Sequence, residues 1–580
     1  MLRIRIALAQ MNPTVGDLEG NCDSVVAFAR SASEAGAHMA VFPEMVVTGY
    51  SVEDLALRND FVSASITATH RLAARLAAEG LGEMPSVVGF LSRRDGGRPG
   101  PGAPAGAPQN ALAVLHRGAV RLVAAKHHLP NYGVFDEFRY FVPGDALPVV
   151  RLHGADIAFA ICEDLWQDGG PVSAVREARA GMLITLNGSP YERHKDDVRL
   201  ELCGRRARET GAAVGYVNMT GGQDELVFEG DSLIVDANGE LLARAPQFEE
   251  ALLVTDVELP EGPPVAELPG TAAGRPVVRH VIPTAPPAPY GASTPVLTPR
   301  PDPVDDTGEV YQALVTGVRD HVRKNGFSSV LVDVSGSVGS ALTAAIAADA
   351  VGAENVHALL TPGETTTLEE TADAEDAVKR GGLVRRLQPV AALADAFRTE
   401  IDAAPGALPA LEDRVRGGIA AAIAAEEGHL MLATADKSAL AMGLCGHYGD
   451  PNGAFAPLKD CWASLVRELA LGRNAAAARD GGPAPVPEGC IGRPPRRSAP
   501  GDGPPLPEQR LLDALLESYI GTDKGVRALI ADGFPPDLVR RVVRLVDRAE
   551  HIRRAYPPGP KITRRNLGRD RRLPITSRWA

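Results

Sequence analysis

Residues 156 to 170, DIAFAICEDLWQDGG, show the pattern on which this sequence is built. An apolar run, long enough for one buried strand, is followed at once by Cys162 and a polar string. The same order recurs where Glu44 follows MAVFP and where Asn187 follows LITL. Apolar runs of this length, with helical segments between them, predict an α/β fold whose chemistry lies at the strand ends.

The composition describes a globular chain with more residues than one core usually holds. Its 580 residues are 45% hydrophobic and 23% charged, which favours two or three domains. The formal net charge of −13 argues against a general nucleic-acid binder. Because no apolar run approaches about 18 residues and the first residues do not resemble a secretory signal, we expect no membrane span and a cytoplasmic location.

A Pro-rich passage divides the chain. We expect a linker over residues 259–308, a first domain over 1–258 and a second over 309–580. After the passage, the strand SSVLVDV, the turn SGSVGS and the helix ALTAAIAADAVG form an order that suits anion binding. In the first domain we also expect a helix over residues 172–181, VSAVREARAG.

The six cysteines show no CxxC spacing, so the sequence predicts neither a zinc site nor a disulfide framework. Cleaving a carboxamide through a thioester requires a thiol, a carboxylate that moves protons and a cation that holds the oxyanion. Cys162, Glu44 in VFPEMVVTGY and Lys126 in AAKHHLPNYGVFDEFRYF offer these three groups. Taken singly, each has a structural alternative: a buried thiol, a helix-start carboxylate and a solvated charge.

These strings resemble the Glu, Lys and Cys motifs of the nitrilase superfamily. They resemble more closely the glutaminase domain of bacterial glutamine-dependent NAD synthetases. The resemblance implies an αββα sandwich in which Glu44 is the general base, Lys126 stabilises the oxyanion and Cys162 is the nucleophile. It also implies a glutamine pocket lined by Tyr50, Tyr132, Glu163 and Ser189.

The second half resembles the NAD synthetase domain, a Rossmann-like, doubly wound fold of the adenine nucleotide α-hydrolase type. The strings GHLMLAT, APLKD and PPGPKITRRNLGRDRRLPIT carry this resemblance. It implies ATP and Mg2+ as cofactors, glutamine and nicotinic acid adenine dinucleotide as substrates, and a homo-oligomer. The nucleotide-binding residues that it implies are Ser335, Gly336, Ser340, Thr434, Lys437, Asp450 and Lys561.

The second half also departs from the family pattern. The family loop Ser-Gly-Gly-x-Asp-Ser reads SGSVGS here, with Gly339 in place of the aspartate. The string Thr-Gly-Asn-Lys-Ser-Glu reads TADKSA, with Ala439 in place of the glutamate, and residues 362–367 read PGETTT where relatives begin Pro-Ser. Because carboxylates at such positions hold the metal that neutralises pyrophosphate, these changes predict weakened adenylation.

Three hypotheses remain open. The first is a ligase in which glutamine hydrolysis at Cys162 supplies ammonia for ATP-dependent synthesis of NAD. The second is a glutaminase or other amidase whose second domain is a scaffold or passes ammonia to a partner. The third is a regulatory subunit of an active synthetase, against which the complete set of amidase residues counts.

Overall fold

The structure is a computed structural model that describes residues 1–94, 106–282, 304–445, 453–494 and 506–579. The chain divides into two compact units. The first contains Met1–Gln223 and Phe228–Pro303, and the second contains Asp224–Val227 and Val304–Ala580.

The first unit contains two large β-sheets. In the six-stranded sheet the order is β14 (Ala251–Leu259), β1 (Leu2–Gln10), β2 (Met39–Val41), β3 (Ser86–Arg93), β4 (Pro108–His116) and β5 (Ala119–Ala125). In the eight-stranded sheet the order is β13 (Leu241–Arg244), β12 (Leu233–Val235), β9 (Ala213–Asn218), β8 (Met182–Asn187), β7 (Ala155–Ile161), β6 (Leu147–Leu152), β16 (Arg275–Val281) and β15 (Thr271–Ala272).

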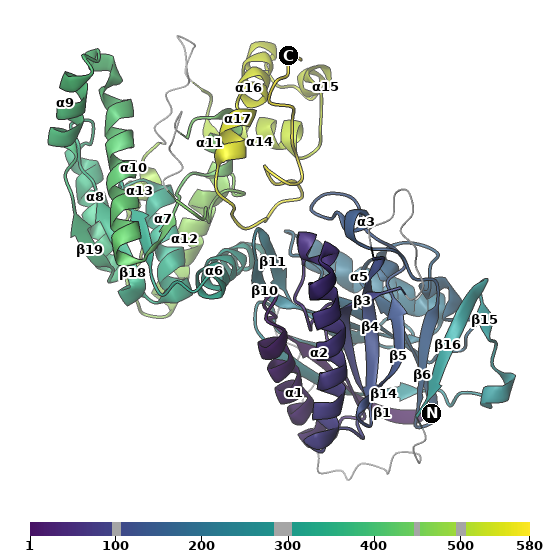
Figure 1. The fold of residues 1–580 in the computed structure, drawn as a ribbon. Helices are drawn as coiled ribbons and strands as arrows, with labels where there is room; N and C mark the ends of the chain where they lie inside the picture. The colour runs from purple at the N-terminus through teal and green to yellow at the C-terminus, as the bar shows by residue number, and fades with distance from the viewer. Residues whose placement is uncertain (95–105, 283–303, 446–452, 495–505, 580) are drawn as a thin grey trace. The chain divides into compact units, whose positions relative to one another are not determined.

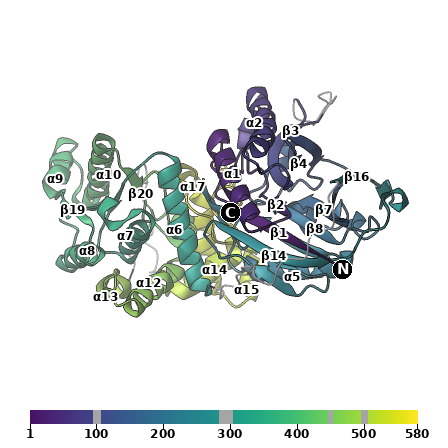
Figure 2. The same ribbon diagram turned by 90° about the horizontal axis from the view of Figure 1, so that it is seen from below.

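The two sheets pack face to face, with one layer of helices on each outer side. Alternate residues of β1, such as Ile6, share a core with alternate residues of β7, such as Phe159. The other face of the six-stranded sheet packs against α1 (Leu18–Glu34) and α2 (Asn59–Ala78), which lie side by side in both ribbon views (Figures 1 and 2). The opposite sheet is covered by α5 (Lys195–Thr210). These layers confirm the predicted αββα sandwich.

Strand ends bring the predicted first-half residues together. In the eight-stranded sheet, β7, β8 and β9 are parallel, so the segments after their carboxyl ends meet at one edge. Cys162 follows β7, and Ser189 comes two residues after β8. Glu44 follows β2 in the facing sheet.

Two sequence expectations about local structure are wrong. Residues 172–181 form a single 3-10 turn, Val172–Ala174, and not a helix. Two glycines with positive φ precede this segment and Arg179 adopts φ 60°, so the backbone leaves the helical region at both ends. The expected linker over 259–308 begins too early, because β15 and β16 lie inside it and β16 pairs in parallel with β6. Residues 283–303 lie outside the described residues.

The second unit contains a parallel four-stranded sheet in the order β19 (Val384–Leu387), β18 (Val356–Leu360), β17 (Val330–Asp333) and β20 (Leu430–Leu432). Helix α10 (Leu408–Glu427) packs on the face that carries Leu331 and Leu359 (Figure 2). Helix α7 (Val338–Val351) also packs against β17 and β18. From β17 the chain adds β18 and β19 on one side and then returns to add β20 on the other side of β17. This reversal is that of a doubly wound sheet and confirms the predicted Rossmann-like fold.

The remaining helices of the second unit are α6 (Asp306–Lys324), α8 (Leu368–Gly381), α9 (Ala391–Glu400), α11 (Lys437–Met442), α12 (Ala463–Arg479), α13 (Glu488–Gly492), α14 (Gln509–Ile520), α15 (Val526–Ala531), α16 (Pro536–Arg548) and α17 (Glu550–Ala555). Within the described ranges, none of the helices combines the length and the apolar character that a membrane span requires. All six cysteines are buried free thiols.

Candidate active sites

The thiol of Cys162 lies at a sharp turn between β7 and the short helix α4 (Glu163–Trp166). Its backbone adopts φ 42° and ψ −97°, a conformation that a side chain rarely accepts and that marks functional sites when the surroundings enforce it. Asp164 helps to enforce it by accepting hydrogen bonds from the backbone amides of Ile161 at 3.2 Å and His128 at 2.8 Å.

Glu44 is fully buried, and hydrogen-bond donors surround its carboxylate. Its Oε1 accepts from the Lys126 ammonium at 2.8 Å and from the Asn110 amide at 2.7 Å. Its Oε2 accepts from the backbone N–H of Gly188 at 2.7 Å. These three donors hold the Glu44 carboxylate in one orientation.

Lys126 joins Glu44 to a second buried carboxylate. Its Nζ also donates to Oε1 of Glu137 at 3.0 Å, and the same oxygen accepts from the Tyr50 hydroxyl at 3.0 Å. Burial raises the pKa of Glu137 to about 7 although the Lys126 charge opposes the rise. Burial disfavours the ammonium, but Glu137 and Glu44 outweigh it and raise the pKa of Lys126 well above its usual value.

Cys162 is 5% exposed and lies within the electrostatic reach of this group. Burial, followed by the negative charge of Glu44, raises the pKa of the Cys162 thiol well above its ordinary value, and Lys126 opposes the rise. These effects favour the protonated thiol of Cys162 in the resting site. Such an arrangement requires a base at the moment of attack.

The other residues expected to line a glutamine pocket fall into two places. Tyr132 is 57% exposed, and its hydroxyl donates to Glu163 Oε1 at 3.0 Å. Ser189 is buried, and its backbone N–H donates to Oδ1 of Asn218 at 2.9 Å. Tyr50 is buried beside Glu137, to which its hydroxyl donates. The half-exposed Tyr132 therefore marks the outer end of the candidate site, and the buried Ser189 marks its inner end.

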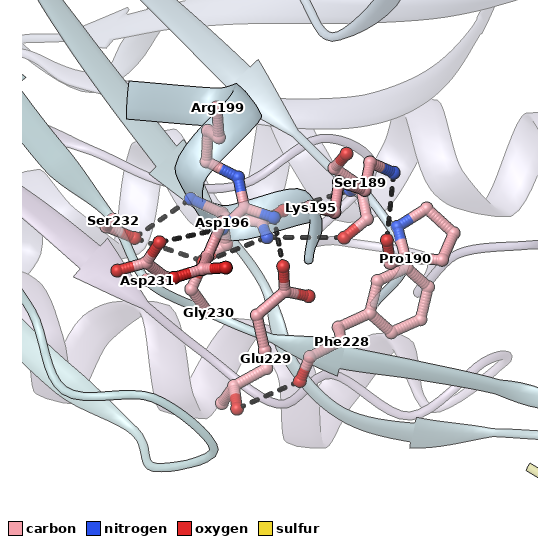
Figure 3. A network of polar contacts seen from close by, with 12 residues as sticks. Ser189, Pro190, Lys195, Asp196, Arg199, Phe228, Glu229, Gly230, Asp231 and Ser232 are labelled. Atoms are coloured by element: carbon pink, nitrogen blue, oxygen red, sulfur yellow. Dashed lines mark hydrogen bonds and ion pairs between the residues drawn. The ribbon is translucent and has the colours of Figure 1, made fainter. Parts of the chain in front are cut away.

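A buried ion-pair network lies next to Ser189 (Figure 3). Arg199 is fully buried, contacts Glu229 at the end of β11 (Leu226–Glu229), and pairs with Asp231 at 2.8 Å. Lys195, one turn before Arg199 on α5, donates to the Pro190 carbonyl at 2.9 Å. Burial lowers the pKa of Lys195 although Glu229 opposes this. The network places cationic side chains close to the inner end of the site.

The second unit has a cavity of about 430 Å³ at the carboxyl ends of its sheet. The segments that follow β17, β18 and β20 contribute Ser335, Thr361 and Thr434 to its lining. Four carboxylates and two guanidinium groups also line it: Asp333, Glu370, Asp413, Asp436, Arg416 and Arg493. A cavity at this switch point is where doubly wound sheets bind nucleotides.

Only some of the predicted nucleotide-binding residues lie at this cavity. Ser335 and Thr434 line it, and Ser340 bonds to Ser335 in the loop before α7, with its Oγ accepting from the Ser335 N–H at 3.1 Å. Gly336 belongs to the same loop, where φ is 79° and an added Cβ would lie 2.2 Å from the Glu370 carbonyl oxygen. This contact and φ both require glycine.

The two predicted lysines do not line the cavity. Lys437 pairs with Asp460 at 2.7 Å and donates to the Arg565 carbonyl at 2.7 Å. Lys561 pairs with Asp570 at 3.1 Å. Both ammonium groups hold the C-terminal segment 561–571 in place. The remaining predicted residue, Asp450, lies outside the described residues.

Two protein-family models match the chain, Carbon-nitrogen hydrolase over residues 5–265 and NAD synthase over residues 310–556. The glutamine-dependent NAD(+) synthetase of Acinetobacter baylyi is 34% identical and that of Rhodobacter capsulatus is 35% identical, each covering 100% of this chain and 99% of the relative. This chain belongs to the glutamine-dependent NAD(+) synthetase family. The structure of the Acinetobacter baumannii member, described as a complex with adenosine diphosphate, has 32% identity and a TM-score of 0.73 and covers 100% of this chain and 99% of that chain.

As a member of the glutamine-dependent NAD(+) synthetase family, the chain is expected to bind a nucleotide in this cavity, and two small residues line it. Gly339 and Ala439, the two positions where the sequence comparison led us to expect carboxylates, both line the cavity. A Cβ on Gly339 would lie 2.8 Å from the Thr434 carbonyl oxygen, so this position has little room for a side chain. The cavity retains Asp333, whose carboxylate accepts from the Thr361 hydroxyl at 3.0 Å, and Asp436, whose Oδ1 accepts from the Ala439 N–H at 2.8 Å.

Sequence reasoning missed Glu137 and Asn110, the two other side chains that contact Lys126 and Glu44. Glu137 lies within the quoted string after Lys126, but Asp136 stands beside it, and the string alone does not say which carboxylate points inward. Asn110 is the third residue of β4 and directly precedes its apolar run ALAVL. The available signal was an amide directly before a buried apolar run, because a buried polar group needs partners, but Gln109 beside it offers the same signal.

Proposed function

We propose that this protein hydrolyses glutamine in its first unit and uses the ammonia in its second unit for the ATP-dependent amidation of nicotinic acid adenine dinucleotide to NAD. The observation that carries the proposal is the buried Cys162, Glu44 and Lys126 group in a chain whose full-length relatives are named glutamine-dependent NAD(+) synthetases. The cavity at the switch point of the second unit supports the nucleotide half.

In the amidase half, Glu44 takes the thiol proton and the Cys162 thiolate attacks the carboxamide carbon. Lys126 donates to the carboxamide oxygen as that oxygen becomes negative. The backbone N–H of Cys162 does not serve as this donor, because it is already bonded to the Leu186 carbonyl at 3.0 Å. Collapse expels ammonia, which receives the proton from Glu44, and leaves a thioester on Cys162. Glu44 then deprotonates water, and attack on the thioester releases glutamate and restores the thiol.

Glutamine recognition follows from charge and position. Glu163, oriented by Tyr132 and by the Gln167 amide at 2.9 Å, would accept from the substrate ammonium. Ser189 and the neighbouring cation Lys195 would meet the substrate carboxylate at the inner end. Tyr50 would pack beside the carboxamide, because its hydroxyl is held by Glu137.

In the synthetase half, ATP would adenylate the carboxylate of the dinucleotide with loss of pyrophosphate, and ammonia would then displace AMP. The loop 335–340 would contact the phosphates through its amides and hydroxyls. The donor set fits Mg2+, a hard ion that prefers oxygen ligands, because Asp333 and Asp436 line the cavity. When bound there, Mg2+ would neutralise charge on the departing pyrophosphate.

A second candidate function is an amidase whose ligation step is weak. The observation that favours it is the absence of a carboxylate at two cavity positions, Gly339 and Ala439. The protein would then release glutamate and ammonia faster than it makes NAD. For either function we propose a cytoplasmic homo-oligomer, which size-exclusion chromatography with light scattering would test.

One assay separates the two functions. Purified protein is incubated with glutamine, ATP, Mg2+ and nicotinic acid adenine dinucleotide, and glutamate and NAD are measured separately. Coupled synthesis predicts similar amounts of the two products, whereas a weak ligation step predicts glutamate in large excess. Absence of both products would contradict the proposed function.

A further inference from the structure

Two histidines and a glutamate meet in the second unit, at the edge of the sheet away from the cavity. His357 is the second residue of β18, His429 directly precedes β20, and Glu427 is the last residue of α10. The strands are parallel, so these positions lie at the amino ends, whereas the cavity is lined from the carboxyl ends. The group therefore lies apart from the nucleotide cavity, and an inference about it does not depend on the proposed function.

The ligand atoms of this group converge. Nε2 of His429 lies 3.1 Å from Oε2 of Glu427, and the two imidazole rings are 3.9 Å apart between centroids. One ligand atom from each of the three residues lies within 4.8 Å of the other two. Two ligands at about 2.1 Å from one ion are separated by roughly 3.0 to 3.4 Å, which matches the distance between His429 and Glu427. Among the residues that the structure describes, this is the one such group of three.

Neighbouring side chains orient two of the three residues. Nδ1 of His429 lies 2.7 Å from the Ser329 hydroxyl, which directs Nε2 toward Glu427. Metal-bound histidines usually have such a partner on the other ring nitrogen. Arg386 contacts Oε1 of Glu427, so Oε2 faces the histidines.

We propose that His357, Glu427 and His429 bind one Zn2+ ion or a similar divalent transition ion. Two imidazoles and one carboxylate suit Zn2+, whereas Mg2+ and Ca2+ prefer oxygen ligands. Three protein ligands leave a fourth position for water. The bound ion links β18, the end of α10 and the start of β20, and so stabilises the second unit.

Arg386 provides a sharp test of the charge. Its guanidinium pairs with Glu427, but both side chains are more than a third exposed, and such surface pairs hold little energy. The cation of Arg386 repels a metal ion at the same carboxylate. Removing it therefore strengthens metal binding, whereas removing a ligand weakens it.

The experiment titrates metal-free, full-length protein with Zn2+ by calorimetry. All variants carry Cys162→Ala, so that the thiol of the other unit does not compete for zinc. We expect one equivalent in the parent, at least tenfold weaker binding in His357→Ala and in Glu427→Gln, and at least twofold tighter binding in Arg386→Ala. His70→Ala, which changes an exposed histidine on α2 of the first unit, serves as the matched control and should equal the parent.

Two further measurements complete the test. Co2+ should give visible absorption bands that His357→Ala loses and His70→Ala keeps, and Zn2+ should raise the melting temperature of the parent more than that of His357→Ala. His357 is half-buried and Glu427 is exposed, so these variants should fold, which circular dichroism checks. Failure of the parent to bind an equivalent, or equal binding by His357→Ala, Glu427→Gln and His70→Ala, would overturn the proposal.

Discussion

At the scale of single residues, the first unit is distinguished by a buried thiol, Cys162, within the electrostatic reach of the buried carboxylate of Glu44. Burial alone makes Cys162 a poor nucleophile, because it raises the pKa of the thiol. Cys162 can attack only if a base removes the thiol proton, and Glu44 is the candidate base. The two oxygens of Glu44 accept hydrogen bonds from Lys126, Asn110 and Gly188, which fix their position. The reactivity of Cys162 therefore depends on the group and not on the thiol itself.

Cys162→Ala should reduce glutamate release by at least roughly a thousandfold, because removing a catalytic nucleophile usually costs more than that. Glutamate is measured with an enzymatic assay and the fold is checked by circular dichroism. Cys203→Ala and Cys461→Ala, which change buried thiols elsewhere in the chain, should retain activity. Residual hydrolysis above this level in Cys162→Ala would place the nucleophile at another residue.

Glu137 should make the first unit less stable as the pH rises. Its pKa is about 7 in the folded protein and 4.5 in a model compound, so between these values the folded state binds more protons than the unfolded state. This contribution to stability is fully present below pH 4.5 and is lost as the pH rises through 7. Glu137→Gln, which stays neutral, should lose less melting temperature than the wild type between pH 5 and pH 8.

The control for this prediction is Glu83, an exposed carboxylate whose hydrogen bond to Arg117 lowers its pKa. Glu83→Gln should follow the wild-type dependence of melting temperature on pH. A parallel dependence for Glu137→Gln and the wild type would show that Glu137 is not protonated in the folded protein near neutral pH.

At the level of secondary-structure elements, the cavity of the second unit is shaped by helix starts. Ser337 caps α7, Thr367 caps α8 and Asp436 caps α11, each by accepting a backbone N–H of the first turn. Loops that are tied in this way present their other polar groups in fixed positions. The walls of the cavity therefore depend on local caps as well as on the sheet.

Thr367 and Glu370 form a reciprocal capping box at the start of α8. Thr367→Ala should destabilise the second unit by about 1 kcal/mol, the usual cost of losing such a cap. The change is measured as a lower urea midpoint of the corresponding unfolding transition. Thr367→Ser keeps the hydroxyl and should behave like the wild type, and an equal loss in the serine variant would assign the effect to the lost methyl group.

At the level of the whole molecule, two units with different chemistry share one chain, and their activities can be measured separately. The amidase group has a complete set of buried polar contacts. The cavity of the second unit is lined by Gly339 and Ala439, where we expected carboxylates, and by Asp333 and Asp436. We therefore expect the two half-reactions of this protein to differ in rate.

With ammonium in place of glutamine, the unmodified protein should make little NAD from ATP and nicotinic acid adenine dinucleotide. The double change Gly339→Asp with Ala439→Glu should raise the rate, because it restores oxygen ligands where charge must be neutralised. The gain should be partial, because a Cβ at residue 339 would lie 2.8 Å from the Thr434 carbonyl oxygen and the backbone there must shift. NAD is measured by enzymatic cycling.

The matched control is the single change Ala439→Glu, which avoids that contact. It should have a higher melting temperature than the double variant. Rapid NAD formation by the unmodified protein at saturating ammonium would contradict the prediction, and would indicate that Asp333 and Asp436 suffice to hold the metal.

Much of the fold, and the residues that meet in the candidate amidase site, could be predicted from the sequence. Apolar runs of strand length show the layers, because burial of one strand needs only local composition. Glu44, Lys126 and Cys162 were predicted because each follows a strand or lies in a distinctive string, and the structure brings these three residues together. The expected helix over 172–181 failed because backbone conformations at its two ends overrode its composition.

Only the tertiary structure selected Glu137 over its neighbour Asp136, because the direction of a side chain depends on what packs around it. It also assigned β16 to a sheet instead of a linker. The Pro-rich composition of this region does not predict a strand, and β16 forms because its backbone pairs with β6. The grouping of His357, Glu427 and His429 likewise needed the fold. Residues 70 positions apart meet only when parallel strands are aligned, and no local pattern encodes that register.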